Sequence, residues 1–373
     1  MSMYRAAVIG LGRMGSTYDD EVEHGGTVTL PYCHGPSYYY SPRTELISGA
    51  DPHPEQRSMF GERWDISEDR LYTDYKEMIE REQLDIVSVT TTAKIRASIV
   101  KDVARSGVKA IWAEKPIAFS LEEADEMLEV CNDNGVVLAL NTARRWMSSY
   151  TEIKQILDSG KLGQILQITG YWRCALSHNG SHLIDIIRFL AGGNIEWVFG
   201  EMSSDQEAEL DDDLEGNGYL AFDNGIRAFL RSMDCGNAVG TYIDVICEAG
   251  RIVCKEGSGE YLVYQIGSGI EGTQRKGESP VVYPVPLPAR PQGTGLTIIE
   301  DLISSIDNKT KPRASIEDGI ASLEIAIALR ESHRKGGVKV KLPISDRSLG
   351  IRSNETLKGD IPARIRRQLE NGS

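Results

Sequence analysis

The sequence predicts an α/β protein in which a doubly wound parallel sheet is followed by an α+β domain with a large, mostly antiparallel open sheet. Three observations support this prediction. A glycine-rich turn ends the first apolar run, short apolar runs alternate with helical stretches as far as residue 142, and strand-like runs dominate after about residue 150. We therefore expect domains at residues 1–142 and 143–345, with a C-terminal tail at 346–373.

The first domain reads as repeated βαβ units. The helical stretch after Ser120 carries Glu123 three positions on, which is the spacing of a capping box. Alternation of short apolar runs and helices is typical of a parallel sheet. Expected strands lie at 4–10, 44–51, 84–92, 107–116 and 134–141, and expected helices at 75–83, 95–107 and 120–135.

The second domain begins with a helix and a long strand and then becomes rich in strands. Asn224-Gly225, between two strand-like segments, indicates a tight hairpin. The helices within 296–336 are expected to pack back towards the first domain, and the tail contains a helix-like segment at 361–371. In order, the expected elements are a helix at 150–163, a strand at 164–174, a helix at 181–193, a run of strands, and a last strand at 338–343.

Composition excludes several classes of protein. The 373 residues carry a formal net charge of −14, which argues against nucleic acid as the main partner because phosphate binding needs a basic surface. No apolar run approaches the length of a membrane span, and the N-terminus lacks the pattern of a signal peptide. The six cysteines are scattered, as in a reduced cytoplasmic protein, so a cytoplasmic location without a membrane partner is expected.

The segment "VIGLGRMG" places Gly10, Gly12 and Gly15 in a G-x-G-x-x-G pattern directly after the first strand. In a dinucleotide site the first glycine permits the tight turn, the second allows a pyrophosphate to approach the backbone, and the third permits close helix packing. An ordinary glycine turn is the alternative. The preceding strand and the following βαβ pattern favour a Rossmann domain.

Asp51 ends the second strand, where an acid binds the ribose hydroxyls of NAD. A carboxylate there repels a 2′-phosphate, which favours NAD over NADP. The segment 19–41, read as a loop and a short helix, accounts for its unusual distance from the glycines. The residues expected to contact NAD are Gly10, Leu11, Gly12, Arg13, Met14, Gly15, Asp51, Thr91, Glu114 and Lys115.

The segment "IWAEKPIAF" places Glu114, Lys115 and Pro116 at the end of a buried strand. A solvated charge pair at a turn is the structural interpretation. The functional one is a cation over the crevice at the carboxyl ends of the strands, where it can stabilise an alkoxide or carry its proton.

These features together resemble the GFO/IDH/MocA (glucose–fructose oxidoreductase/inositol dehydrogenase) family. The resemblance implies an NAD(P)-dependent oxidoreductase acting on a sugar or cyclitol, with an open sheet that often makes oligomer contacts, hence a homo-oligomer, dimer or tetramer. It also implies that Lys115 lies beside the nicotinamide and reaches the reacting hydroxyl. The matching segments are "AVIGLGRMG", "AEKPIA", "GKLGQILQITGYW", "GSHLIDIIRFLAGG" and "SIEDGIASLEIAIALRESHRKGGVKVKLP".

The segment "SHNGSHLID" supplies the second part of the expected site. The family usually has D-x-x-x-H followed by a further aspartate, and here His182 and Asp185 match while His178 stands at the first aspartate position. His182 can take the substrate proton while Lys115 holds the oxygen. His178 is expected to contact substrate or orient His182; a zinc pair with His182 lacks a third ligand in the sequence, and we predict no metal. Asp185 is either catalytic or structural.

Further substrate contacts are expected where the chain leaves the first domain and on the first strand of the second. Aromatic faces and forked donors suit sugars, and arginine also suits a carboxylate or phosphate. The family's Thr-Pro-x-x-x-His is replaced by "TTTAKIR", which leaves that part of the cofactor site open. The expected substrate-binding residues are Arg144, Arg145, Trp146, Trp172, Arg173, Asn179 and Asp185.

The leading hypothesis is an NAD-dependent dehydrogenase or reductase of a sugar, glycoside or cyclitol, with Lys115 and His182 handling the hydroxyl proton. One alternative is an NAD-dependent glycoside hydrolase or lyase that oxidises the sugar transiently and needs an additional base. Another is a non-catalytic NAD-binding regulator, which the histidine at position 178 suggests.

Overall fold

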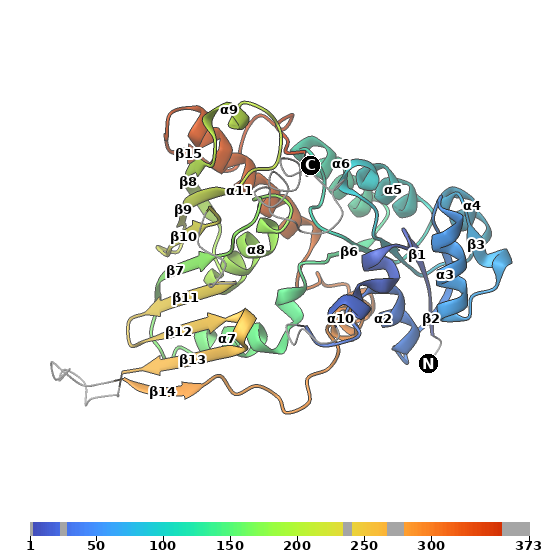
Figure 1. The fold of residues 1–373 in the computed structure, drawn as a ribbon, viewed down its shortest axis with the longest axis horizontal. Coiled ribbons are helices and arrows are strands. Elements are labelled where there is room, and N and C mark those ends of the chain that lie inside the picture. Colours follow the sequence, from blue (N-terminus) through green and yellow to red (C-terminus); the bar gives the residue numbers. More distant parts are fainter. Residues whose placement is uncertain (1–2, 23–27, 234–240, 267–279, 353–373) are drawn as a thin grey trace, which may run out of the picture.

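The computed structural model describes residues 3–22, 28–233, 241–266 and 280–352. Figure 1 shows the N-terminal domain beside the large sheet of the C-terminal domain, with helices α8 (Gly180–Ala191) and α11 (Ile316–Arg334) between them. The helix expected at 361–371 lies outside the described residues. In the described part of the chain, no helix is long and apolar enough to cross a membrane.

The N-terminal domain contains a six-stranded parallel sheet in the order β3-β2-β1-β4-β5-β6, which confirms the predicted doubly wound fold. The strand order reverses between β1 and β4, so a crevice opens there at the carboxyl ends of the strands. The strands are β1 (Tyr4–Ile9), β2 (Thr44–Ala50), β3 (Leu71–Tyr72), β4 (Ile86–Val89), β5 (Ala110–Ala113) and β6 (Val137–Leu140).

Helices connect these strands. Ser120 caps α6 as predicted, because its hydroxyl accepts a hydrogen bond from the backbone of Glu123 at 3.2 Å. The Glu123 carboxylate bonds the backbone of Phe119 rather than that of the cap residue. The elements are η1 (Arg13–Thr17), α1 (Tyr18–Val22), α2 (His34–Tyr40), α3 (Pro54–Trp64), η2 (Glu68–Arg70), α4 (Tyr75–Arg81), α5 (Ala93–Arg105) and α6 (Leu121–Asp133).

The C-terminal domain contains a nine-stranded sheet in the order β14-β13-β12-β11-β7-β10-β9-β8-β15. Only the β10–β7 pair among these described strands is parallel, so the predicted mostly antiparallel sheet is confirmed. Gly225, with φ of +88°, turns the predicted hairpin. The strands are β7 (Ile165–Tyr171), β8 (Ile195–Met202), β9 (Gly216–Phe222), β10 (Arg227–Arg231), β11 (Tyr242–Cys247), β12 (Gly250–Lys255), β13 (Glu260–Gln265), β14 (Val281–Pro284) and β15 (Val340–Lys341).

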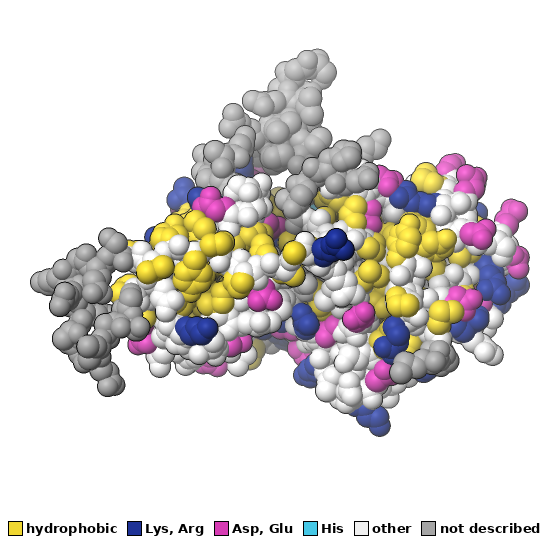
Figure 2. Space-filling model, turned by 90° about the horizontal axis from the view of Figure 1, so that it is seen from below, with side chains coloured by type: hydrophobic (Ala, Val, Ile, Leu, Met, Phe, Trp, Pro, Cys, Tyr) yellow, Lys and Arg dark blue, Asp and Glu magenta, His cyan; other side chains and the backbone are white. Residues whose placement is uncertain are grey.

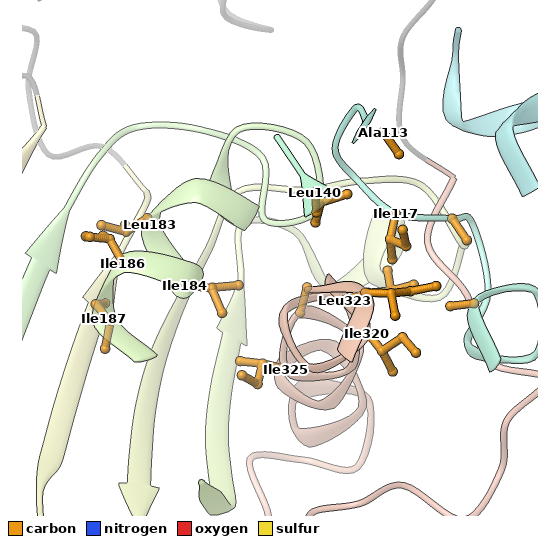
Figure 3. Packing of buried hydrophobic residues seen from close by; sticks show 14 of the residues in the cluster. Ala113, Ile117, Leu140, Leu183, Ile184, Ile186, Ile187, Ile320, Leu323 and Ile325 are labelled. Carbon is orange, nitrogen blue, oxygen red and sulfur yellow. The ribbon is translucent and has the colours of Figure 1, made fainter. Parts of the chain in front are cut away.

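One apolar core runs through both domains. Figure 3 shows Ile184 of α8, Leu323 of α11 and Leu140 of β6 in the same buried cluster. Because α11 packs on β8 and α8 and also on α6 and β6, the core fixes the second domain over the crevice of the first. The remaining elements are η3 (Ala143–Trp146), α7 (Ser148–Asp158), α9 (Asp205–Ala208), η4 (Glu256–Ser258) and α10 (Thr294–Asn308).

Candidate active site

The site lies where the carboxyl ends of β1, β2, β4, β5 and β6 meet the start of α8. A parallel sheet delivers all its strand ends to one edge, so residues distant in sequence meet there. The second domain contributes the segment before α8 and the first turn of that helix. The contributing segments are the glycine turn 10–15, Asp51, Thr90–Thr91, Glu114–Lys115, Asn141–Thr142 and residues 177–182.

The glycine turn has the geometry of a phosphate cradle. Gly10 has φ of +91°, and a Cβ on Gly15 would lie 2.1 Å from the Gly10 carbonyl oxygen, so neither position accepts a side chain without rearrangement. A Cβ on Gly12 would meet no described atom within 4 Å. Open space over the middle glycine is what the approach of a pyrophosphate requires.

Asp51 joins the end of β2 to this turn. Its buried carboxylate accepts the backbone N–H of Leu11 and of His53, each at 2.9 Å. Each oxygen keeps lone-pair capacity for another donor, such as a ribose hydroxyl. Arg57 donates to the Asp51 carbonyl oxygen at 2.7 Å, which places a cation nearby without pairing it to the carboxylate.

Three buried polar atoms at the strand ends have no hydrogen-bond partner within the described parts of the chain: Thr91 Oγ1, Asn141 Oδ1 and Thr142 Oγ1. Buried polar atoms are normally paired, so such atoms at one edge indicate that a polar ligand completes them. With the open glycine turn and the Asp51 carboxylate, they fit a dinucleotide.

Lys115 spans the crevice. Its Nζ donates to Asn179 Oδ1 at 3.0 Å, and this bond links the end of β5 to the segment that begins α8. The buried Arg96 guanidinium donates to the carbonyl oxygens of Pro116 and Thr91 and so holds the chain beside Lys115. Arg96 belongs to the segment "TTTAKIR", whose role the sequence left open.

Glu114 is a buried carboxylate behind Lys115. It accepts hydrogen bonds from His34 Nε2 at 3.2 Å, Asn141 Nδ2 at 2.5 Å and the Lys115 backbone at 3.2 Å. Burial alone would raise its pKa, but the His34 hydrogen bond, the Lys115 charge and the Asn141 bond lower the pKa of Glu114 below its usual value. It is therefore ionised at neutral pH.

His182 lies beside Lys115 as a buried ring. It stacks on Trp172 with ring centroids 6.1 Å apart, and the Arg144 guanidinium lies 4.6 Å from the Trp172 ring. Burial, and then the charges of Lys115 and Arg144, lower the pKa of His182 well below its usual value. The imidazole is thus neutral at pH 7, and its Nδ1 has no hydrogen-bond partner among the described residues.

Asp213, which the sequence did not single out, also belongs to the site. Its two carboxylate oxygens accept the backbone N–H groups of Ser177 and His178, each at 2.7 Å. Burial raises the pKa of Asp213 to about 7, although its backbone bonds and the Lys115 charge oppose the rise. Asp213 lies within three consecutive aspartates, 211–213, a pattern that is typical of a solvated surface and carries no motif.

Two predicted substrate residues are already paired within the protein. Arg144 makes a bidentate bond to Glu256 at 2.8 and 2.9 Å, and the Tyr150 hydroxyl donates to the same carboxylate. Arg173 donates to Glu215 at 3.2 Å. The Arg144–Trp172–His182 stack therefore forms one wall of the site, and whether these residues contact substrate stays a prediction.

Arg145, Asp185 and Trp146 are also paired within the protein. Arg145 makes a bidentate bond to Asp185 at 2.8 and 2.7 Å and a further bond to Asp318 at 3.0 Å, all largely buried. Trp146 donates to Asp301 at 3.0 Å. These contacts engage the polar groups of all three side chains, and whether these residues also contact substrate stays a prediction.

His178 and His182 are the two residues whose spacing raised the question of a metal site. Within the described ranges, no group of three or more His, Cys, Asp or Glu side chains is placed to hold a metal ion.

Two family models match the chain. Residues 4–142 match the GFO_IDH_MocA model, described as an oxidoreductase family with an NAD-binding Rossmann fold. Residues 154–342 match the corresponding C-terminal alpha/beta domain.

Curated relatives are similar over parts of their length. D-apiose dehydrogenase of Paraburkholderia graminis is 30% identical over 170 residues, covering 40% of this chain and 43% of that protein. The scyllo-inositol 2-dehydrogenase (NAD(+)) of Bacillus subtilis is 28% identical over 247 residues, covering 59% of this chain and 64% of that protein. The chain thus spans less than two thirds of the length of each.

Solved structures agree in fold. Levoglucosan dehydrogenase in complex with NADH superimposes with a TM-score of 0.73 at 20% identity, covering 92% of this chain and all of the other (100%). An aldose–aldose oxidoreductase from Caulobacter crescentus gives a TM-score of 0.72 at 18% identity, covering 91% and 100% of the two chains.

Proposed function

Since this chain belongs to the GFO/IDH/MocA family of NAD-binding oxidoreductases, we propose that it is an NAD-dependent dehydrogenase or reductase of a sugar, glycoside or cyclitol. It would transfer a hydride between the nicotinamide and a hydroxyl-bearing carbon. The observation that carries the proposal is the Lys115 ammonium, which bonds Asn179 across the crevice beside the neutral, buried His182.

Each residue has a definable task in this reaction. Bound NAD supplies the hydride acceptor. The glycine turn and Asp51 hold the dinucleotide, and the Lys115 ammonium stabilises the negative charge that develops on the reacting oxygen. The neutral His182 ring accepts the hydroxyl proton, and its low pKa favours passing that proton on.

The proposal is tested by incubating the full chain with NAD and a panel of sugars, cyclitols and aryl glycosides. The absorbance of NADH and the release of free sugar are followed in parallel. NADH formed in proportion to the substrate consumed supports a dehydrogenase and identifies its substrate class. Neither NADH nor sugar release with any member, despite measurable NADH binding, would favour a non-catalytic regulator.

An NAD-dependent glycoside hydrolase or lyase is the second candidate, because such a reaction needs a further acid–base group. Asp213 is a candidate for this group. Its pKa is raised to about 7, and its carboxylate accepts the backbone N–H of His178. Sugar release without net NADH supports this candidate, since its cycle returns the hydride to the substrate.

Cofactor selection by Asp51 gives the first quantitative prediction. Replacement by alanine removes the acceptor for the ribose and leaves the Leu11 N–H unpaired, so NADH affinity is expected to fall by about tenfold or more. NADPH should be affected less, because the variant no longer repels a 2′-phosphate. Fluorescence titration of both nucleotides measures the change; Glu55→Ala, an exposed acid on α3, is the control. Equal losses for both variants would contradict the role of Asp51.

We also propose that the chain forms a homo-oligomer through the outer face of the C-terminal sheet. Phe199, Tyr219 and Phe229 stand side by side on β8, β9 and β10, and Phe199 and Phe229 are each 40% exposed. At the other end of the sheet, Val281 and Val282 of edge strand β14 are exposed, and Figure 2 shows hydrophobic side chains gathered over this domain. Exposed apolar patches of this kind mark interaction surfaces.

Phe229→Asp is therefore expected to shift a dimer or tetramer towards monomer, because it places a charge at the exposed β10 end of the aromatic row. Light scattering during size-exclusion chromatography measures the mass. Tyr40→Asp on the N-terminal domain, where Tyr40 is 61% exposed, is the matched control and should not change it. A monomeric wild-type chain would overturn the proposal. The cytoplasmic location expected from the composition stays a prediction.

A further inference from the structure

A buried chain of polar side chains runs behind Lys115. Ser88 Oγ lies 2.8 Å from the Tyr38 hydroxyl and 2.8 Å from His34 Nδ1, while His34 Nε2 lies 3.2 Å from Glu114 Oε1. Tyr38, Ser88 and His34 are completely buried, and Glu114 is 5% exposed. The His34 ring stacks on Trp112 with centroids 3.6 Å apart, so its orientation is fixed.

The proton positions in this row of side chains follow from the ionised Glu114 at its end. An ionised Glu114 can only accept hydrogen bonds, so His34 Nε2 must carry a proton. Burial lowers the pKa of His34, which keeps the ring neutral, and its Nδ1 must then accept the Ser88 hydroxyl proton. The Ser88 oxygen is left to accept from the Tyr38 phenol. All three donors therefore point towards Glu114.

We propose that His34 is a positioning residue for the reaction at Lys115: as the neutral Nε2–H tautomer it keeps Glu114 ionised. Glu114 in turn holds the Lys115 backbone N–H and the Asn141 amide at the ends of β5 and β6. His34 is the first residue of α2, in the segment between the glycine turn and β2. Through Glu114, this segment therefore helps to position Lys115. The role at Lys115 depends on the proposed function, whereas the state of His34 and Glu114 does not.

Removal of His34 should change how the site responds to pH. Glu114 now has a lowered pKa; without the His34 bond, its burial raises that pKa. Glu114 then takes up a proton as the pH falls through the mildly acidic range, and the effect is absent at higher pH. Other charges also affect the pair. Lys115 lowers the pKa of Glu114, while Arg96 lowers and Asp19 raises the pKa of His34.

The first test needs no substrate. NMR of the full-length, ¹⁵N-histidine-labelled chain, with His34→Gln for assignment, reports the tautomer and charge of His34 between about pH 5 and pH 8. We expect a neutral Nε2–H ring that does not titrate in this range. A titrating ring, or the Nδ1–H tautomer, would overturn the proposal.

The second test follows Lys115 itself. Reductive methylation with ¹³C-formaldehyde gives a Lys115 NMR signal, assigned with Lys115→Arg. In His34→Leu the chemical shift of this signal should change in one step as the pH falls below neutral. The wild type should show no such step. In His34→Gln, which keeps an amide donor, the step should be weaker. Tyr38→Phe, which leaves the His34–Glu114 bond intact, is the matched control and should show no step. A step of equal size in the control, or none in His34→Leu, would contradict the proposal.

Once a substrate is known, His34→Leu should lower kcat by about tenfold or more at acidic pH, with recovery at higher pH and little change in KM. A chain with no turnover on any substrate would remove the proposed function, yet the two NMR measurements would still decide the state of His34 and Glu114.

Discussion

Turnover is expected to fall by about a thousandfold when Lys115 is replaced by methionine, because the ammonium that stabilises the developing charge is lost. Methionine keeps an unbranched apolar stem of similar length, so the crevice should remain filled. Loss of the bond to Asn179 removes one link between β5 and α8, but the apolar core that joins the domains is untouched. NADH affinity should therefore change little, and the loss should appear in kcat.

The measurement combines steady-state kinetics on a substrate found by the screen with fluorescence titration of NADH. Lys76→Met, at a side chain that is 60% exposed, is the control and should keep wild-type rates. If Lys115→Met retained most of its turnover, Lys115 could not be the electrostatic centre of the reaction. If it lost NADH binding and turnover in parallel, its contribution would be to the cofactor site instead.

The fold could be predicted because its signals are local. Glycines 10, 12 and 15 follow an apolar run directly, and strands β2, β4, β5 and β6 are short apolar segments. The segment between β2 and α4, which contains α3, η2 and β3, was not predicted. β3 has only two residues, too few for a pattern, and α3 is largely polar and exposed, so neither leaves a hydrophobic period in the sequence.

The site could be predicted only as far as local motifs reach. Lys115 and Asp51 stand at strand ends, where topology brings them to one edge. The partner of each charged group could not be predicted, because packing decides it: Arg144 pairs with Glu256, 112 positions away. In the same way, nothing in the sequence around His34 predicts its contact with Glu114, which lies 80 positions later.

Arg145 was expected at the substrate, which stays a prediction, and its buried partners predict a large effect on stability. Arg145→Met is expected to lower the free energy of unfolding by about 3–5 kcal/mol, because it leaves the Asp185 carboxylate, 1% exposed, without its bidentate partner. Asp318, which also accepts from Arg145, retains Arg188 at 3.1 Å. Urea unfolding at neutral pH, followed by circular dichroism, measures the change.

The control separates burial from the mere presence of an ion pair. Arg173→Met breaks the half-buried pair with Glu215 and should lower the free energy of unfolding by only about 0–1 kcal/mol. Adding Asp185→Leu to Arg145→Met should recover part of the loss, since the double variant no longer buries a carboxylate whose remaining cation, Arg188, lies 3.9 Å away. If the two single variants were equally stable, the Arg145–Asp185 pair would not hold η3 to α8, and a role for Arg145 in the crevice would have to be reconsidered. A strongly destabilised Arg145→Met that recovers with Asp185→Leu instead assigns this arginine to the joint between the two domains.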